Sequence, residues 1–149
     1  MNEKTILIVD DEPNVLNSLK RLLNPRGYKV LTAEGGSEAL ELLSANSDIC
    51  IVLTDYQMPL ITGVDLLFEV RRYFPEVGGI ILSGQADLST VINAFNSGAI
   101  YKFLEKPWDN DQLLDVIADT FHIVQGYKRR NASVESGRFM SQDEPDWML

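Results

Sequence analysis

Residues 5–12 read TILIVDDE, a run of β-branched and apolar residues that ends abruptly in three acidic side chains. A short, continuous run of this kind is typical of a strand buried on both faces of a parallel sheet. Similar runs recur at residues 29–33, 49–54, 79–83 and, less distinctly, 101–104. The sequence therefore predicts five strands.

Between these runs the apolar spacing changes to the three-and-four pattern of amphipathic helices. The expected helix ends are marked, in chain order, by Pro13 and Pro25, Ser37, Pro75, Asp87 or Ser89 with Gly98, and Asn110. Strands that alternate with helices over short connections require right-handed crossovers. The sequence thus predicts an α/β fold, a doubly wound (βα)5 arrangement with a five-stranded parallel sheet and helices on both faces.

This repeating pattern occupies residues 1–125, which we expect to form one domain. The remaining residues, 126–149, have no sustained period and are rich in Ser, Gly, Asn and acidic residues. We expect them to be a poorly ordered C-terminal tail or the start of a linker. A chain of 149 residues leaves little room for a second module.

The composition narrows the classes of partner and compartment. Thirteen Lys and Arg against 22 Asp and Glu give a net charge of −9, which argues against direct binding of nucleic acid. No apolar stretch is long enough for a membrane span, and the N-terminus does not resemble a signal peptide, so we expect a cytoplasmic protein without membrane contact. The single residues Cys50 and His122 exclude an internal disulfide and a multi-histidine metal site.

Polar side chains follow four of the five predicted strands. Asp10 and Asp11 come after the first strand, Asp55 after the third, Ser83 ends the fourth, and Lys106 follows the fifth. In an open α/β sheet, ligands bind outside the carboxyl ends of the strands. We therefore expect these five residues to meet at one edge of the sheet.

Three clustered carboxylates repel one another unless a cation lies among them. A divalent ion together with Lys106 would balance the charge of Asp10, Asp11 and Asp55. An all-oxygen, partly hydrated site favours Mg²⁺, with Mn²⁺ as an alternative, over Zn²⁺. Such a site suits a phosphoryl group, whose oxygens the ion, Lys106 and Ser83 would contact while a carboxylate attacks in line.

Four motifs carry a family resemblance: IVDDEP at 8–13, LTDYQMP at 53–59 with Gly63 following, ILSG at 81–84, and FLEKPW at 103–108. In order and spacing they resemble the receiver domain of bacterial two-component response regulators, the CheY-like superfamily. The resemblance covers about residues 4–125, and the Lys-Pro-Trp ending is similar to one subgroup. It implies a flavodoxin-like, CheY-like sheet with strand order 2-1-3-4-5.

The resemblance also implies a role for each residue of the predicted site. Asp55 would accept a phosphoryl group from a phosphohistidine on a sensor histidine kinase or phosphotransfer protein. Asp10, Asp11, Asp55 and the backbone carbonyl of Gln57 would hold Mg²⁺. Lys106 would pair with Asp55 before phosphorylation and with the phosphoryl group afterwards.

Two further residues would form the switch that the resemblance implies. Ser83 would bond a phosphoryl oxygen, and Phe103, where the family more often has Tyr, would turn inward when Ser83 moves. The bond between Lys106 and Pro107 would be cis. Phosphorylation would change the surface of the fourth helix, fifth strand and fifth helix, where a downstream partner or a second copy of the chain would bind.

Two alternatives remain open at this point. A phosphatase of the haloacid-dehalogenase type also uses a strand-end Asp, Mg²⁺, a hydroxyl and a Lys, but it needs a second Asp where this chain has Gln57. The chain could instead be a regulatory receiver fragment of a larger protein with a cyclic-dinucleotide or other output module. We expect no turnover of external substrates, only the domain's own phosphotransfer and slow autodephosphorylation.

Overall fold

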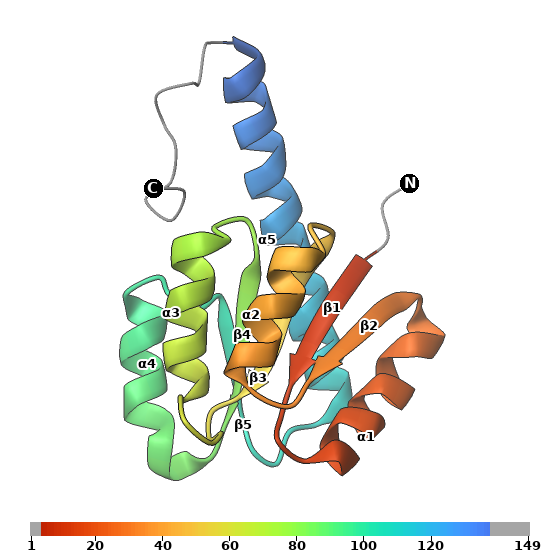
Figure 1. Cartoon of the computed structure of the whole chain (residues 1–149), viewed down its shortest axis with the longest axis vertical. Coiled ribbons are helices and arrows are strands. Elements are labelled where there is room, and N and C mark those ends of the chain that lie inside the picture. The colour runs from red at the N-terminus through yellow and green to blue at the C-terminus, as the bar shows by residue number, and fades with distance from the viewer. Residues whose placement is uncertain (1–3, 138–149) are drawn as a thin grey trace.

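The computed structural model describes the backbone of residues 4–137 and the side chains of residues 4–126. Five parallel strands form one sheet in the order β2-β1-β3-β4-β5, which confirms the expected fold. The strands are β1 (Lys4–Val9), β2 (Tyr28–Ala33), β3 (Ile49–Asp55), β4 (Gly78–Ser83) and β5 (Lys102–Glu105). The helices that connect and follow them are α1 (Pro13–Leu23), α2 (Gly36–Ala45), α3 (Gly63–Tyr73), α4 (Leu88–Asn96) and α5 (Asn110–Gly137) (Figure 1).

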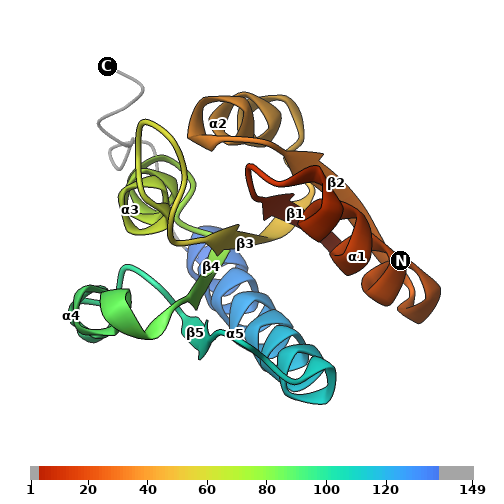
Figure 2. The ribbon, with the colours of Figure 1, turned by 90° about the horizontal axis from the view of Figure 1, so that it is seen from below.

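The helices cover both faces of the sheet, α1 and α5 on one and α2, α3 and α4 on the other (Figure 2). Side chains alternate between two core clusters along β1. Ile6 and Ile8 pack with α1 and α5, whereas Leu7 and Val9 pack with α2, α3 and α4. Because both faces are covered, the central strands need apolar residues at successive positions, which accounts for their continuous apolar runs.

Local capping differs from the sequence-based expectation at three helices. The N-cap residue of α2 is Gly35, and Ser37 lies inside the first turn. At α5 the side chain of Asp109, not Asn110, accepts a hydrogen bond from the first turn, from the Asp111 N–H at 2.9 Å. A capping box that the expectation missed, Thr62 with Asp65, begins α3.

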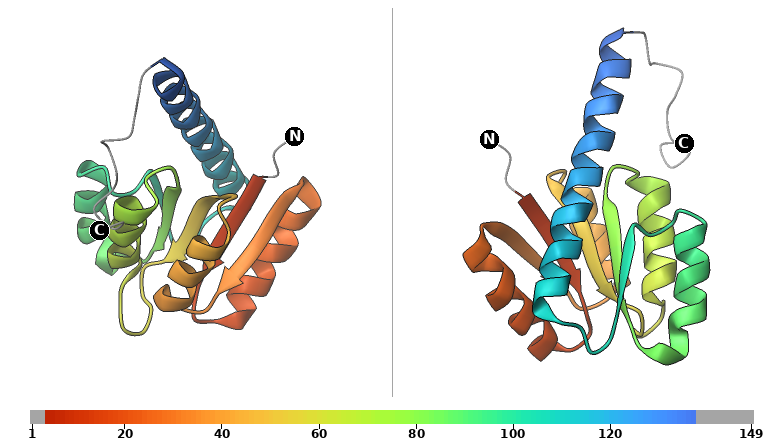
Figure 3. Two further views of the ribbon diagram at one scale, coloured as in Figure 1. Left: turned by 45° about the horizontal axis from the view of Figure 1, so that its top comes forward. Right: turned by 180° about the vertical axis from the view of Figure 1, so that it is seen from behind.

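The last helix is longer than expected. The predicted boundary at Gln125 lies inside α5, which continues to Gly137, so residues 126–137 are helical instead of irregular. That segment contains strong helix formers, Lys, Arg, Ala and Glu, which sustain a helix without apolar periodicity. Its end projects beyond the sheet edge at which β1 begins (Figure 3). The rest of the predicted tail, residues 138–149, lies outside the described residues.

No helix in the described part of the chain, α5 included, combines the length and the apolar character needed to cross a bilayer.

Candidate functional site

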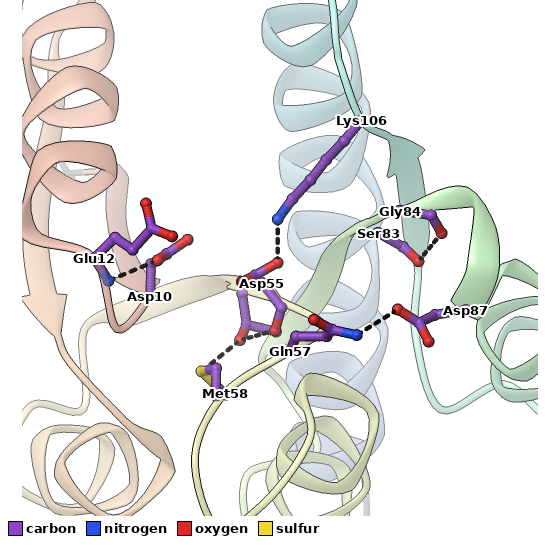
Figure 4. Close-up of polar contacts among 10 residues, drawn as sticks. Asp10, Glu12, Asp55, Gln57, Met58, Ser83, Gly84, Asp87 and Lys106 are labelled. Atoms are coloured by element: carbon purple, nitrogen blue, oxygen red, sulfur yellow. Dashed lines mark hydrogen bonds and ion pairs between the residues drawn. The ribbon is translucent and has the colours of Figure 1, made fainter.

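The strand order places two of the predicted acidic residues side by side. β1 and β3 are neighbours at the centre of the sheet, and Val9 pairs with Thr54 in the parallel register. Asp10, which follows β1, and Asp55, the last residue of β3, therefore lie next to each other at the carboxyl edge (Figure 4). The chain runs from β1 to β2 on one side and continues from β3 on the other side, so the strand order reverses next to β1. In open α/β sheets, ligands bind at the carboxyl edge beside such a reversal.

The first half of the site is a cluster of three carboxylates, as expected. Asp10, Asp11 and Asp55 each offer an oxygen within 4.8 Å of the others. Asp10 and Asp55 are buried, with 4% and 8% of their surface exposed, whereas Asp11 is exposed. Such a group of oxygen ligands is suited to a hard divalent cation.

Burial raises the pKa of the Asp10 carboxyl above its ordinary value. The neighbouring carboxylates of Asp55 and Asp11 raise this pKa further. A hydrogen bond from the Glu12 N–H, 2.9 Å from Oδ1, and the charge of Lys106 oppose the rise. The ionised form of Asp10 is therefore disfavoured here, and a cation among the carboxylates would favour it.

The second half of the site is the ammonium group of Lys106. Its Nζ lies 2.5 Å from Oδ1 of Asp55 and points at the acidic cluster from beyond the end of β5 (Figure 4). The Lys106 N–H donates to the carbonyl of Ser83 at 2.8 Å, which ties its backbone to the end of β4. The bond between Lys106 and Pro107 is cis, as the resemblance implied.

A cavity of about 800 Å³ opens onto Asp55. Its wall consists of residues from the loops at the carboxyl edge: Asp11, Glu12, Asp55, Tyr56, Gln57, Met58, Pro59, Thr62, Gly84, Gln85, Ala86, Asp87 and Lys106. One bond that the sequence analysis did not anticipate joins two of these loops, because Nε2 of Gln57 donates to Oδ2 of Asp87 at 3.3 Å. The carboxylate of Asp55 is therefore part of the wall of an open cavity.

Ser83 and Phe103 are not among the residues that line the cavity. Ser83 is fully buried, and its hydroxyl donates to the Gly84 carbonyl at 2.9 Å (Figure 4). Phe103 is half-buried and packs edge-to-face against Phe95 of α4, with ring centroids 5.5 Å apart. Ile81, two residues before Ser83, pairs with Phe103 in the register, so Ser83 and Phe103 face the same side of the sheet.

The family model of the response regulator receiver domain matches residues 6–118 of this chain. The chain belongs to this family. Response regulators act with histidine kinases and downstream effectors, so the receiver domain described here is regulatory. The acidic cluster at the carboxyl edge of its sheet corresponds to the place where receiver domains generally bind Mg²⁺.

Among known proteins, this receiver domain is similar to the hydrogenase transcriptional regulatory protein HoxA of Cupriavidus necator. The two are 37% identical over 115 residues, which is 77% of this chain and 23% of HoxA. The chain spans about a quarter of the length of the curated relatives that it matches.

The fold is shared with solved structures of receiver domains, and two of them serve as examples. The signal receiver domain of an HD domain-containing protein from Pseudomonas fluorescens Pf-5 is 30% identical, with a TM-score of 0.81 over 87% of this chain and 95% of that one. A response regulator receiver domain protein from Clostridium thermocellum is 34% identical, with a TM-score of 0.78 over 82% and 97%.

Proposed function

We propose that this receiver domain is a phosphorylation-activated switch in which Asp55 accepts a phosphoryl group from a sensor histidine kinase or phosphotransfer protein. One observation carries the proposal: Asp55 lies 2.5 Å from Lys106 Nζ, among the carboxylates, at the wall of an open cavity. In the transfer, the phosphorus–nitrogen bond of a phosphohistidine breaks with its electron pair going to the imidazole. A phosphorus–oxygen bond forms to a carboxylate oxygen of Asp55.

The acidic cluster fits a Mg²⁺ ion, with Mn²⁺ as the alternative. The fit rests on the all-oxygen donor set within 4.8 Å and on the raised pKa of Asp10, which a bound cation would lower. We assign Asp10, Asp11, Asp55 and the backbone carbonyl of Gln57 as the protein ligands. When bound, the ion supplies positive charge to the oxygens of the transferring group.

Lys106 positions Asp55 before the transfer and pairs with the phosphoryl oxygens afterwards. Its ammonium needs only a small movement, because it already contacts the carboxylate that is to be modified. The hydroxyl of Ser83 turns from the Gly84 carbonyl to a phosphoryl oxygen, a stronger, charged acceptor. The space that Ser83 leaves admits the ring of Phe103 from the same side of the sheet.

Phe103 links this movement to an exposed apolar surface. Its partner Phe95 is 40% exposed, and Ile92 on the same helix is 38% exposed. Burial of such side chains favours association with another protein surface. We propose that phosphorylation changes the surface formed by α4, β5 and α5, where a downstream effector or a second copy of the chain binds.

The proposed activity is regulatory and not the turnover of external substrates. The chain catalyses its own phosphotransfer and slow autodephosphorylation. Gln57 supports this distinction, because its amide cannot act as the general acid and base that a phosphatase of the haloacid-dehalogenase type requires. We place the receiver in residues 1–125 of a cytoplasmic protein and residues 126–149 in a tail or linker.

The decisive experiment is incubation of the full chain with acetyl phosphate and Mg²⁺, followed by intact mass measurement. Wild type is expected to gain one phosphoryl group that hydroxylamine removes, and Asp55→Asn is expected to gain none. Asp48→Asn is the matched control, because Asp48 precedes the same strand at its opposite end and is exposed. Unchanged labelling of Asp55→Asn would show that the acceptor is misassigned.

The output surface is tested separately by amide exchange with Mg²⁺ and beryllofluoride, a phosphoryl mimic. We expect protection to change along β5 and at residues 92–96, the part of α4 that contacts Phe103, in wild type and to stay constant there in Phe103→Ala. An unchanged α4 in the wild-type protein would refute the output surface without affecting the assignment of Asp55.

A further inference from the structure

A side-chain hydrogen bond joins two residues of the cavity wall that are 30 positions apart in sequence. Nε2 of Gln57, in the loop after β3, donates to Oδ2 of Asp87 at 3.3 Å (Figure 4). Gln57 is exposed and Asp87 half-buried, and both line the cavity that contains Asp55 and Lys106. This bond therefore connects the loop beside the phosphoryl acceptor to the start of α4.

Asp87 occupies the N-cap position of α4 but does not cap it. An N-cap Asp normally has an extended backbone and accepts a hydrogen bond from the second or third N–H of the helix. Asp87 has φ −103° and ψ 4°, outside the extended region, and its side chain makes no capping bond. In this structure the carboxylate bonds Gln57 instead, so one side chain has two alternative partners.

We propose that Asp87 is a positioning residue with two states: it bonds Gln57 in the unphosphorylated domain and caps the first turn of α4 after phosphorylation. The proposal rests on the proposed function of Asp55 and adds a second route from the site to α4, separate from Ser83 and Phe103. The exchange of partners by Asp87 would couple the phosphorylation state of Asp55 directly to the first turn of α4.

Phosphorylation of Asp55 weakens the bond between Gln57 and Asp87 for two physical reasons. A phosphoryl group carries about 1.5 to 2 negative charges at neutral pH and replaces the single charge of the Asp55 carboxylate, a net gain of about 0.5 to 1. Asp87 lies on the wall of the same cavity, so the two anions repel. The phosphoryl oxygens also compete for the Gln57 amide, which makes only a long bond to Asp87 now. The Asp87 carboxylate, no longer bonded to Gln57, then accepts a hydrogen bond from an N–H group in the first turn of α4, where the helix dipole is positive.

Two variants distinguish this proposal from the alternative that the hydrogen bond between Gln57 and Asp87 only holds the two segments together. Each variant removes one partner of that bond. Gln57→Leu removes the donor and frees Asp87, so amide exchange at residues 88–91 is expected to slow roughly threefold to tenfold without any phosphodonor. Asp87→Ala removes the capping group itself. Its exchange at 88–91 is expected not to slow, with or without Mg²⁺ and beryllofluoride.

Asp87→Asn and Asp109→Ala complete the set, all measured on the full chain. Asn can cap a helix, so Asp87→Asn is expected to restore the slowing that Asp87→Ala loses. Asp109 caps α5 through the Asp111 N–H, and Asp109→Ala is expected to speed exchange there equally with and without beryllofluoride. This control shows that exchange reports the loss of a cap.

The proposal is wrong if Gln57→Leu and Asp87→Ala change amide exchange at residues 88–91 in the same direction. Both variants lack the hydrogen bond between Gln57 and Asp87, so a shared effect would come from the loss of that bond and not from capping by Asp87. Failure of the proposed function gives a different result, the absence of acetyl phosphate labelling at Asp55. Amide exchange at residues 88–91 in Gln57→Leu and Asp87→Ala, measured without a phosphodonor, decides the role of Asp87 whether or not Asp55 is labelled.

Discussion

The ammonium of Lys106 lies 2.5 Å from a carboxylate oxygen of Asp55, although the two residues are 51 positions apart in the chain. The contact spans one strand of the sheet, because β4 lies between β3, which ends in Asp55, and β5, which precedes Lys106. It places a positive charge beside the acidic cluster, next to the buried carboxylate of Asp55. Its removal should therefore have opposite effects on metal binding and on phosphoryl transfer.

Lys106→Met is expected to bind Mg²⁺ at least as tightly as wild type, because the variant lacks a cation that competes for the carboxylates. Phosphorylation by acetyl phosphate should slow by roughly tenfold or more, since no ammonium stabilises the transferring group. Calorimetry of Mg²⁺ binding and intact mass kinetics measure the two effects. Lys20→Met, an exposed change on α1, should alter neither, and labelling of Lys106→Met at the wild-type rate would contradict the assigned role.

Asp10→Asn should stabilise the metal-free protein at neutral pH by about 1 kcal/mol and prevent Mg²⁺ binding. Burial raises the pKa of Asp10 above its ordinary value of 3.8, so the folded state binds a proton at a higher pH than the unfolded state. The contribution of Asp10 to the free energy of unfolding is fully present below pH 3.8, the ordinary pKa of the group. This contribution is lost as the pH rises through the pKa of Asp10 in the folded state. Asn has no such dependence, and its Oδ1 can still accept from the Glu12 N–H.

This expectation is tested by urea unfolding of both proteins in the presence of EDTA, measured at several pH values between about pH 4 and pH 8. The advantage of Asp10→Asn should be largest at high pH and shrink toward low pH. With excess Mg²⁺ at neutral pH, wild type should gain stability and the variant should not. An advantage that grows as the pH falls would refute the raised pKa of Asp10.

The arrangement of the acidic cluster and Lys106 could be predicted from sequence because it depends on strand ends. Continuous apolar runs identify strands buried on both faces, and the parallel arrangement brings their carboxyl ends to one edge. Asp10, Asp55 and Lys106 each follow such a run. The strand order itself came from the family resemblance and not from residue periodicity.

Side-chain partners could not be predicted in the same way. The bond between Gln57 and Asp87 depends on how two loops approach each other, and neither residue type specifies a partner. The N-cap at Gly35 has no side chain to mark it, and the extension of α5 past Gln125 lacks apolar periodicity. The capping box of Thr62 and Asp65 did have a sequence signal, the T-x-x-D spacing.

Gly63→Ala is expected to destabilise the domain by about 2 to 3 kcal/mol. A Cβ at this position would overlap the backbone carbonyl oxygen of Asp55 and crowd the Thr54 side chain, so the loop would have to move away from the site. Gly84→Ala is the matched control in the same cavity, because a Cβ there meets nothing within 4 Å. Urea unfolding should therefore show a loss for Gly63→Ala only, and equal stability of the two variants would contradict the close approach.

Leu60→Gly is expected to raise the free energy of unfolding by roughly 0.5 to 1 kcal/mol. Leu60 is fully exposed and has φ of 77°, and the Ile61 N–H donates to the Pro59 carbonyl at 2.9 Å. This is a γ-turn with positive φ, a conformation that is strained for residues with a Cβ atom and easily adopted by glycine. Leu60→Ala keeps the Cβ and should gain nothing, which separates backbone strain from the loss of an exposed apolar side chain. If the Ala and Gly variants unfold at the same urea concentration, the turn at Leu60 is not strained.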